Sequence, residues 1–271
     1  MNKIKIYCTS LQYYEIIDKF PSYIIPLGLG NNHFPNNWET EKKGKNIISF
    51  NKYYGELTGF YWVWKNHTNN IGDEDLIGFC HYRKLWMNNN NQFKNKFSFK
   101  SIYSDLLSDE NSILKKVDVI QVKPIIFKKK NLIKDFEEVH KSKILDKSLN
   151  FLNLDDKKNF TMHLNGNILY PLNMFITKKK FFINYCETIF PWLENCYDYC
   201  RANNLLNGYN VRLPAFLAER FTSYWFSRFN SKATLNYARL GSFFLNSKLN
   251  NYFNTLKIPF TSIMYPTIHR Y

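Results

Sequence analysis

Apolar residues along the chain form short continuous runs that alternate with longer stretches in which they recur at helical spacing. A short continuous run is typical of a strand that is buried on both faces of a sheet. Runs of strand length lie at residues 4–9, 23–27, 76–80, 118–122 and 173–177. Because helical segments separate these runs, the pattern predicts an α/β sheet architecture.

Helical spacing is clearest just before the 76–80 run. Leu57, Phe60 and Trp64 fall on one face and Asn51 is placed to cap the helix, so an amphipathic helix is predicted over residues 53–66. Further helices are predicted at residues 103–116, 131–141, 179–200 and from 214 onward. With no internal repeat and no Pro/Gly/Ser linker, we expect one domain over residues 1–235 and a helical C-terminal extension over 236–271.

Composition narrows the class of protein. Hydrophobic residues make up 45% of the 271 residues, enough to bury a core, so a disordered chain is excluded. No run approaches the roughly 20 apolar residues of a membrane span, and Lys3 and Lys5 interrupt the start where a signal peptide would be apolar. The five cysteines follow neither disulfide nor zinc spacing, so we expect reduced thiols in a cytoplasmic protein and no structural metal.

Basic residues are in large excess. Lys and Arg number 37 against 22 Asp and Glu, a formal net charge of +15. Such an excess points toward phosphate, on nucleic acid, on a lipid surface or on a sugar nucleotide. Lysine runs at 128–130 and 178–180 stand at the ends of apolar segments, where solvation is the simplest role. Charge alone therefore leaves all three partners open.

The end of the 76–80 run carries the sharpest chemical signal. His81, Tyr82, Arg83 and Lys84 follow this predicted buried strand directly. Ligands of open α/β sheets bind beyond the carboxyl ends of the strands, and Arg and Lys are suited to anions. The sequence thus indicates an anion site here, with a solvated basic turn as the alternative.

Three neighbouring segments carry a resemblance to a known family. They read GKNII at 44–48, YGELTGFYWVWKN at 54–66 and IGFCHYRK at 77–84. This combination resembles a bacterial family of capsular and exopolysaccharide biosynthesis glycosyltransferases, which is marked by an ELT-x-x-YW-x-WKN helix and a strand ending in HYRR. Weaker matches extend the resemblance over roughly residues 3–230. The chain departs from the family at Thr9-Ser10, where His-Lys is usual, and at Lys84 and the residues after it.

The resemblance implies a GT-A type glycosyltransferase with a Rossmann-like mixed sheet flanked by helices. Such an enzyme moves a sugar from a nucleoside diphosphate to a growing glycan. The first expectation is a hexose of galactose type, as pyranose or furanose, passed from a UDP-linked donor to a capsule, lipopolysaccharide or exopolysaccharide acceptor. The acceptor would be lipid-linked, and the tail at 237–260 either rests on the inner face of the cytoplasmic membrane or packs on the domain.

Many GT-A enzymes hold a divalent metal with an Asp-x-Asp pair at a strand end. The strand that looks equivalent ends here in His81-x-Arg83 instead. We therefore expect metal-independent catalysis with no cofactor besides the donor, in which Arg83, Lys84 and His81 offset the charge of the leaving group.

An inverting transfer also needs a general base. Glu219 is the first candidate, because it follows Arg212 on a predicted helix and points away from the Leu217 and Phe221 stripe. An ordinary surface glutamate is the alternative. Glu56, at the start of the aromatic helix, competes for the role and equally suits a structural or donor-positioning part.

The remaining candidate residues fall into two groups. Residues expected to bind the donor are Thr9, Asn46, Tyr54, Glu56, Tyr82, Lys84 and Asp118. Residues expected to bind the sugar or acceptor are Asn173, Arg212 and Arg220. Tyr54 equally suits the core and Asp118 a capped turn, while His140 and His163 are expected on the surface.

Two other functions stay open. A basic chain rich in aromatics is typical of a nucleic-acid-binding protein, although no helix-turn-helix, zinc-finger or RNP pattern occurs and the basic residues are dispersed. A sugar-nucleotide-binding protein without turnover is the third reading. The expected partners are a nucleotide-sugar donor and a glycan acceptor, not nucleic acid.

Overall fold

The computed structural model describes residues 3–88 and 103–239, and its centre is a mixed sheet of nine strands. Along the main path the strands are β10 (Lys232–Leu235), β6 (Val119–Val122), β9 (Phe175–Lys178), β4 (Leu76–His81), β1 (Ile4–Ser10), β2 (Ile24–Gly28) and β3 (Glu39–Thr40). Off this path, β5 (Lys84–Trp86) pairs with β4 and with β11 (Tyr237–Arg239).

Strand directions decide where a ligand can bind. β1 runs parallel to β2 and β4, and β9 runs antiparallel between β4 and β6. The carboxyl ends of β1, β2, β4 and β6 therefore meet at one edge of the sheet, where β9 begins. The residues just before β9 thus lie beside the residues that end β4.

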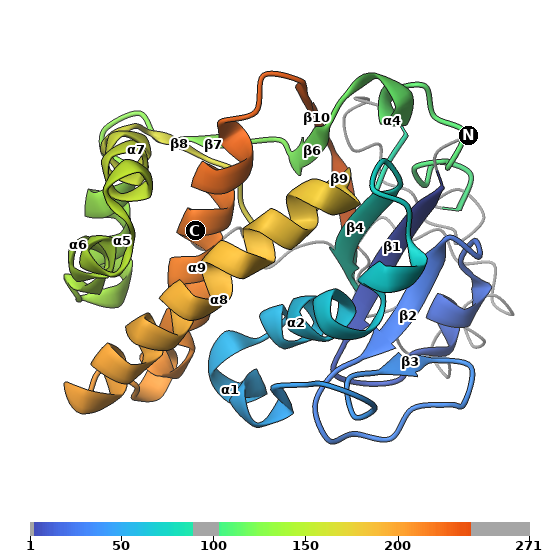
Figure 1. Ribbon diagram of the computed structural model, residues 1–271, viewed down its shortest axis with the longest axis horizontal. Coiled ribbons are helices and arrows are strands. Elements are labelled where there is room, and N and C mark those ends of the chain that lie inside the picture. The colour runs from blue at the N-terminus through green and yellow to red at the C-terminus, as the bar shows by residue number, and fades with distance from the viewer. Residues whose placement is uncertain (1–2, 89–102, 240–271) are drawn as a thin grey trace, which may run out of the picture.

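Helices cover the sheet and extend beyond it (Figure 1). They are α1 (Asn51–Tyr54), α2 (Leu57–Asn66), α4 (Ile113–Lys116), α5 (Leu132–His140), α6 (Ile144–Ser148), α7 (Leu154–Asn165), α8 (Lys179–Ala202) and α9 (Leu213–Ser227). Shorter 3-10 segments are η1 (Glu15–Lys19), η2 (Ile48–Phe50), η3 (Thr68–Asn70), η4 (Leu149–Phe151) and η5 (Gly208–Arg212). A two-stranded ribbon of β7 (Ile125–Ile126) and β8 (Ile168–Leu169) lies outside the main sheet.

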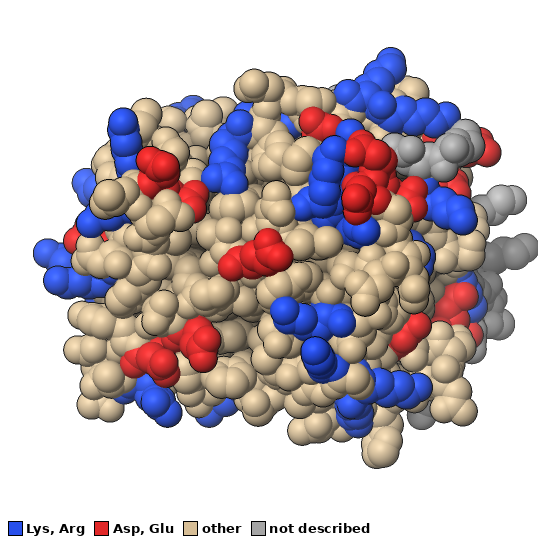
Figure 2. All heavy atoms as spheres, in the orientation of Figure 1, with Lys and Arg blue, Asp and Glu red and all other residues tan. Residues whose placement is uncertain are grey.

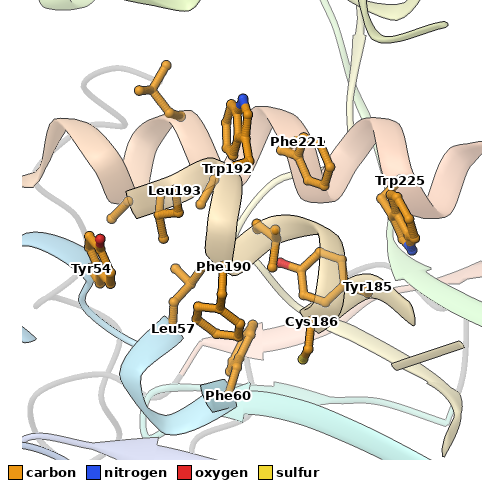
Figure 3. Packing of buried hydrophobic residues seen from close by; sticks show 14 of the residues in the cluster. Tyr54, Leu57, Phe60, Tyr185, Cys186, Phe190, Trp192, Leu193, Phe221 and Trp225 are labelled. Carbon is orange, nitrogen blue, oxygen red and sulfur yellow. The ribbon is translucent and has the colours of Figure 1, made fainter. Parts of the chain in front are cut away.

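Buried apolar side chains form two layers, one on each face of the sheet. Alternation along β1 explains this, since Tyr7 belongs to one layer and Ile6 and Cys8 to the other. The layer beneath α2, α8 and α9 is rich in aromatic rings (Figure 3). Because α8 and α9 pack on each other and on α2, they hold the start of α9 close to the α1–α2 junction.

Several predicted elements differ from those observed. The helix predicted over residues 53–66 breaks at Gly55, where φ is +56°, into α1 and α2. Of the helix predicted at 103–116, the structure keeps only α4 as an α-helix. The predicted helical extension begins with a strand, β11, and residues 240–271 lie outside the described residues.

Other predictions concern burial and the membrane. His140 is buried rather than on the surface, because Asn210 donates to its carbonyl and the Phe136 ring lies against it. All five cysteines are free and buried, as expected for reduced thiols. Within residues 3–88 and 103–239, no helix combines the length and apolarity needed to span a bilayer.

Candidate functional site

A cavity of about 360 Å³ opens at the edge of the sheet where β1 and β4 end and β9 begins. Its walls come from widely separated parts of the chain, namely the ends of β1 and β4, the α1–α2 junction, the turn before β9 and the first turns of α9. Nine predicted site residues line it: Thr9, Glu56, His81, Tyr82, Arg83, Lys84, Asn173, Arg212 and Glu219.

His81 ends β4 and lies in the floor of the cavity. Its Nε2 is 2.8 Å from the carbonyl oxygen of Leu172, and its Nδ1 is 3.3 Å from Thr9 Oγ1. Since a carbonyl oxygen can only accept, Nε2 carries a proton. Burial lowers the pKa of His81, although the Glu56 charge opposes this. His81 is therefore a neutral imidazole at neutral pH, fixed by the backbone of the neighbouring turn.

That turn, just before β9, adopts a strained backbone. Leu172 and Asn173 have φ of +81° and +49°, a left-handed region that residues other than glycine seldom occupy. The N–H of Leu172 donates to Glu219 Oε1 at 2.6 Å, while its carbonyl accepts from His81. The turn is thus held from both sides, and it directs Asn173 inward.

Asn173 joins the turn to the helices. Its Nδ2 donates to Glu56 Oε1 at 2.8 Å, and its Oδ1 accepts from the Thr222 hydroxyl at 3.0 Å. Only 3% of Asn173 is exposed. Both ends of this amide are engaged, so Asn173 fixes Glu56 rather than offering a free side chain.

Glu56 occupies the position before α2 and faces the cavity. Arg212 Nη2 lies 3.2 Å from its Oε2. Burial alone would raise the pKa of Glu56, but the His81 and Arg212 charges and the Asn173 hydrogen bond together hold it below its ordinary value. Glu56 is therefore an ionised carboxylate, paired with an arginine at the mouth of the cavity.

Gly55 makes this pairing sterically accessible. A Cβ atom at Gly55 would lie 2.3 Å from Arg212 Nη2, and the residue has φ of +56°. Any side chain here would meet both the guanidinium and backbone strain. The glycine in the YGELT segment thus breaks the predicted helix and makes room for Arg212.

Glu219 lies in the opposite wall and belongs to a buried chain of charges. Its Oε2 accepts from Arg220 Nη1 at 2.9 Å, and Arg220 Nη2 donates to Asp135 Oδ2 at 2.8 Å. Lys130 Nζ lies 2.9 Å from the other Asp135 oxygen. Since Glu219 is 7% exposed, the surface alternative for it is wrong. Arg220, expected to bind sugar, does not line the cavity and instead pairs with carboxylates behind its wall.

Basic side chains gather at the mouth. Arg83 is exposed, with its guanidinium carbon 5.5 Å from the Tyr82 ring centre, and Tyr82 stacks on Tyr14. Burial, and next the charge of Arg83, lower the pKa of Lys84 to about 8. Lys52 lines the same cavity. Together with Arg212 these cations make the mouth suitable for an anionic ligand.

Three predicted donor-binding residues lie outside the cavity. Asn46 closes a turn by donating to the Gly44 carbonyl, and Tyr54 is buried with its ring stacked on Phe50. Asp118 precedes β6 and pairs with Lys178 at 2.8 Å. Since the amino end of β6 lies at the edge opposite the cavity, Asp118 is far from the site.

Some lining residues gave little signal in the sequence. Asn51 was expected only as a helix cap, and it does bond the Gly55 carbonyl and Thr58 Oγ1. Leu172 contributes its backbone, which no side-chain pattern reveals. Further lining residues that were not singled out as site residues are Ser10, Leu11, Leu29, Lys52, Gly55, Ala215 and Phe216.

The carboxylates of the cavity do not fit a divalent metal. Glu56 and Glu219 are each paired with an arginine, from opposite walls. In the described part of the chain no three His, Cys, Asp or Glu side chains are grouped to hold a metal ion. The one Asp-x-Asp sequence, Asp73 and Asp75, precedes β4 at the opposite edge, where the two carboxylates bind Lys179 and the Lys3 backbone N–H.

Comparison with known proteins agrees with this architecture. The apo structure of the WbbM bifunctional glycosyltransferase is similar, with a TM-score of 0.71 and 20% sequence identity, and the match covers 89% of this chain and 46% of that one. The chain thus spans about half the length of that protein, and the likeness confirms the predicted GT-A type α/β fold. No curated protein sequence matches the chain.

A family model covers most of the same region. The model described as "Domain of unknown function (DUF4422)" matches residues 5–231, which include every strand and helix that builds the cavity. The chain therefore belongs to the DUF4422 family.

Proposed function

We propose that the protein is a glycosyltransferase that takes a sugar from a nucleoside diphosphate donor. The observation that carries this proposal is the cavity at the carboxyl edge of the sheet, in which two arginine-paired carboxylates face a basic mouth. A fold shared with a glycosyltransferase supports it.

The donor diphosphate would lie at the mouth. Arg83 offers a fork of N–H donors and Lys84 a point charge, both next to the end of β4. As the bond from the sugar to the diphosphate breaks, negative charge grows on the leaving phosphate, and these cations offset it without a metal. His81, neutral and bonded to Leu172, serves as a hydrogen-bonding wall rather than as the cation expected from the sequence.

The acceptor must lose a proton as it attacks. We assign this step to Glu219: the acceptor hydroxyl oxygen bonds to the anomeric carbon, its proton passes to the carboxylate, and the nucleoside diphosphate departs. Glu56 is a weaker base because its pKa is lowered, and its bonds to Asn173 and Arg212 suit a positioning role.

The finer assignment follows from the family resemblance. We propose a galactose-type hexose from a UDP-linked donor and an acceptor in capsule, lipopolysaccharide or exopolysaccharide synthesis, at the cytoplasmic side of the membrane. Thr9 and Tyr82 would contact the donor, and Arg212 the acceptor or sugar, since all three line the cavity.

Nucleic acid is a poorer fit to the charge distribution. On the face shown in Figure 2, Lys and Arg are interspersed with Asp and Glu and form no continuous basic field. The lysine run at 178–180 is neutralised locally, because Lys178, Lys179 and Lys180 pair with Asp118, Asp73 and Glu74. Pooled basic surface is what phosphate-backbone binding requires.

The test is release of nucleoside diphosphate from a panel of UDP-, GDP- and dTDP-sugars in EDTA. We expect turnover of one donor without metal, and a loss of about 100-fold or more in Glu219→Gln with donor affinity unchanged within a few-fold. Glu187→Gln, on an exposed part of α8, is the matched control. Full activity in Glu219→Gln would remove the assigned base, and turnover that needs manganese would contradict the metal-free mechanism.

A further inference from the structure

The β7–β8 ribbon displays apolar side chains to solvent. Ile125 pairs with Leu169, and Ile126 pairs with Ile168. Successive residues of a strand face opposite sides, so the first pair packs inward, where Leu169 is fully buried, and the second pair faces out. Ile126 is 62% and Ile168 40% exposed. The ribbon thus carries an outward-facing aliphatic pair that no described residue covers.

Unpaired lysines follow this pair directly. Lys128 and Lys129 are exposed and make no ion pair within residues 3–88 and 103–239, in contrast to the fully paired run at 178–180. Beside them lies a groove of about 390 Å³ lined by Phe127, Lys128, Lys129, Lys130, Lys134 and Glu138. Glu138 is engaged by Lys130, at 2.9 Å, so the groove keeps a positive balance.

Helix α5 adds to that field. It begins at Leu132, next to the groove, and its backbone dipole places partial positive charge at this end. Asn131 already caps the Lys134 N–H, so the contribution is electrostatic rather than a free donor. Figure 1 shows the β7–β8 ribbon beside α7, across the molecule from β1–β3.

We propose that this surface, formed by Ile126, Ile168, Lys128, Lys129 and Lys134, docks on an anionic lipid membrane. Lysines around an exposed aliphatic pair match a bilayer interface, where phosphate headgroups lie over hydrocarbon. Nucleic acid is a poorer occupant, because single strands stack on aromatic rings and the outward pair is aliphatic. This surface is independent of the proposed glycosyl transfer and uses none of the cavity residues.

The experiment is flotation of the full chain with vesicles at low ionic strength. We expect it to float with phosphatidylglycerol/phosphatidylcholine vesicles, to stay behind with phosphatidylcholine alone, and to be released by about 0.5 M salt. Lys128→Ala/Lys129→Ala should lower the partition coefficient roughly 30-fold, as about 1 kcal/mol per lysine implies. Ile126→Ser/Ile168→Ser should weaken binding to the same vesicles several-fold, with the loss persisting at higher salt.

Matched controls separate this surface from general charge. Lys115→Ala/Lys116→Ala removes two adjacent exposed lysines from α4, and Leu154→Ser removes an exposed aliphatic residue from the far end of α7. Both should float like the unaltered chain, and circular dichroism should show all variants folded. The proposal is overturned if the chain does not float, if the two lysine variants weaken equally, if binding survives in Lys128→Ala/Lys129→Ala, or if RNA is bound and vesicles are not.

Discussion

Charged side chains that line the cavity are almost all held by partners distant in the sequence. Glu56 depends on Asn173 and Arg212, and Glu219 on Arg220 and the Leu172 N–H. Buried charges of this kind persist only when they are paired and hydrogen-bonded. The protonation of individual groups should therefore be visible in binding and in stability.

Lys84 makes donor binding sensitive to alkaline pH. Its pKa is lowered to about 8, so the ammonium that would meet the diphosphate loses its proton as the pH rises through 8. We expect nucleoside diphosphate affinity to fall about tenfold between pH 7 and 9 by calorimetric titration. Lys84→Arg should keep the affinity at pH 7 and flatten the pH profile, because guanidinium stays charged. A profile equally steep in Lys84→Arg would exclude Lys84 as its origin.

His163 should control acid stability. Burial, followed by the Arg220 and Lys232 charges, lowers its pKa from 6.5 to about 4. Between those values the unfolded chain binds the proton more readily, so stability is full above pH 6.5 and falls as the pH drops toward 4. In urea titrations at pH 7 and 4.5, the unaltered chain should lose on the order of 2 kcal/mol more than His163→Gln. Equal losses in the two proteins would contradict this.

Among the elements, the α1–α2 junction depends most on one residue. Gly55→Ala meets the left-handed φ and the Arg212 guanidinium, whereas Gly208→Ala has φ of +50° with nothing within 4 Å of the new Cβ. Each should lose about 1 kcal/mol of stability from the backbone. Gly55→Ala alone should also displace Arg212 from Glu56 and lower donor turnover at least several-fold. Chemical denaturation and the nucleotide-release assay check both parts, and equal turnover in the two variants would argue against the junction.

Periodicity predicted elements where one face is apolar and failed where other forces decide. The 76–80 run and the helices at 179–200 and from 214 appear with small shifts as β4, α8 and α9, because each buries a continuous face. Polar α7 gave little signal, since Phe160 and Leu164 are its only buried residues. Gly55 breaks a helix that side-chain spacing made continuous, because its φ is a backbone property.

For the molecule as a whole, strand order creates the site. The resemblance and the strand-end rule predicted His81, Arg83 and Lys84 at a sheet edge, and the edge is where the cavity lies. That Asn173 meets Glu56 depends on β9 entering antiparallel beside β4, a pairing that no local pattern reveals. Asp118 was misplaced for the matching reason, since it stands before its strand rather than after it.

The claim that this edge binds a nucleoside diphosphate without a metal has a direct measurement. Titration calorimetry with UDP, GDP and dTDP in EDTA should show one of them binding, and Arg83→Ala/Lys84→Ala should weaken that binding by about 10- to 100-fold. Lys115→Ala/Lys116→Ala, which removes the same charge from α4, should leave the affinity unchanged. Absence of binding by all three nucleotides, binding only after manganese is added, or equal weakening in both variants would contradict the account.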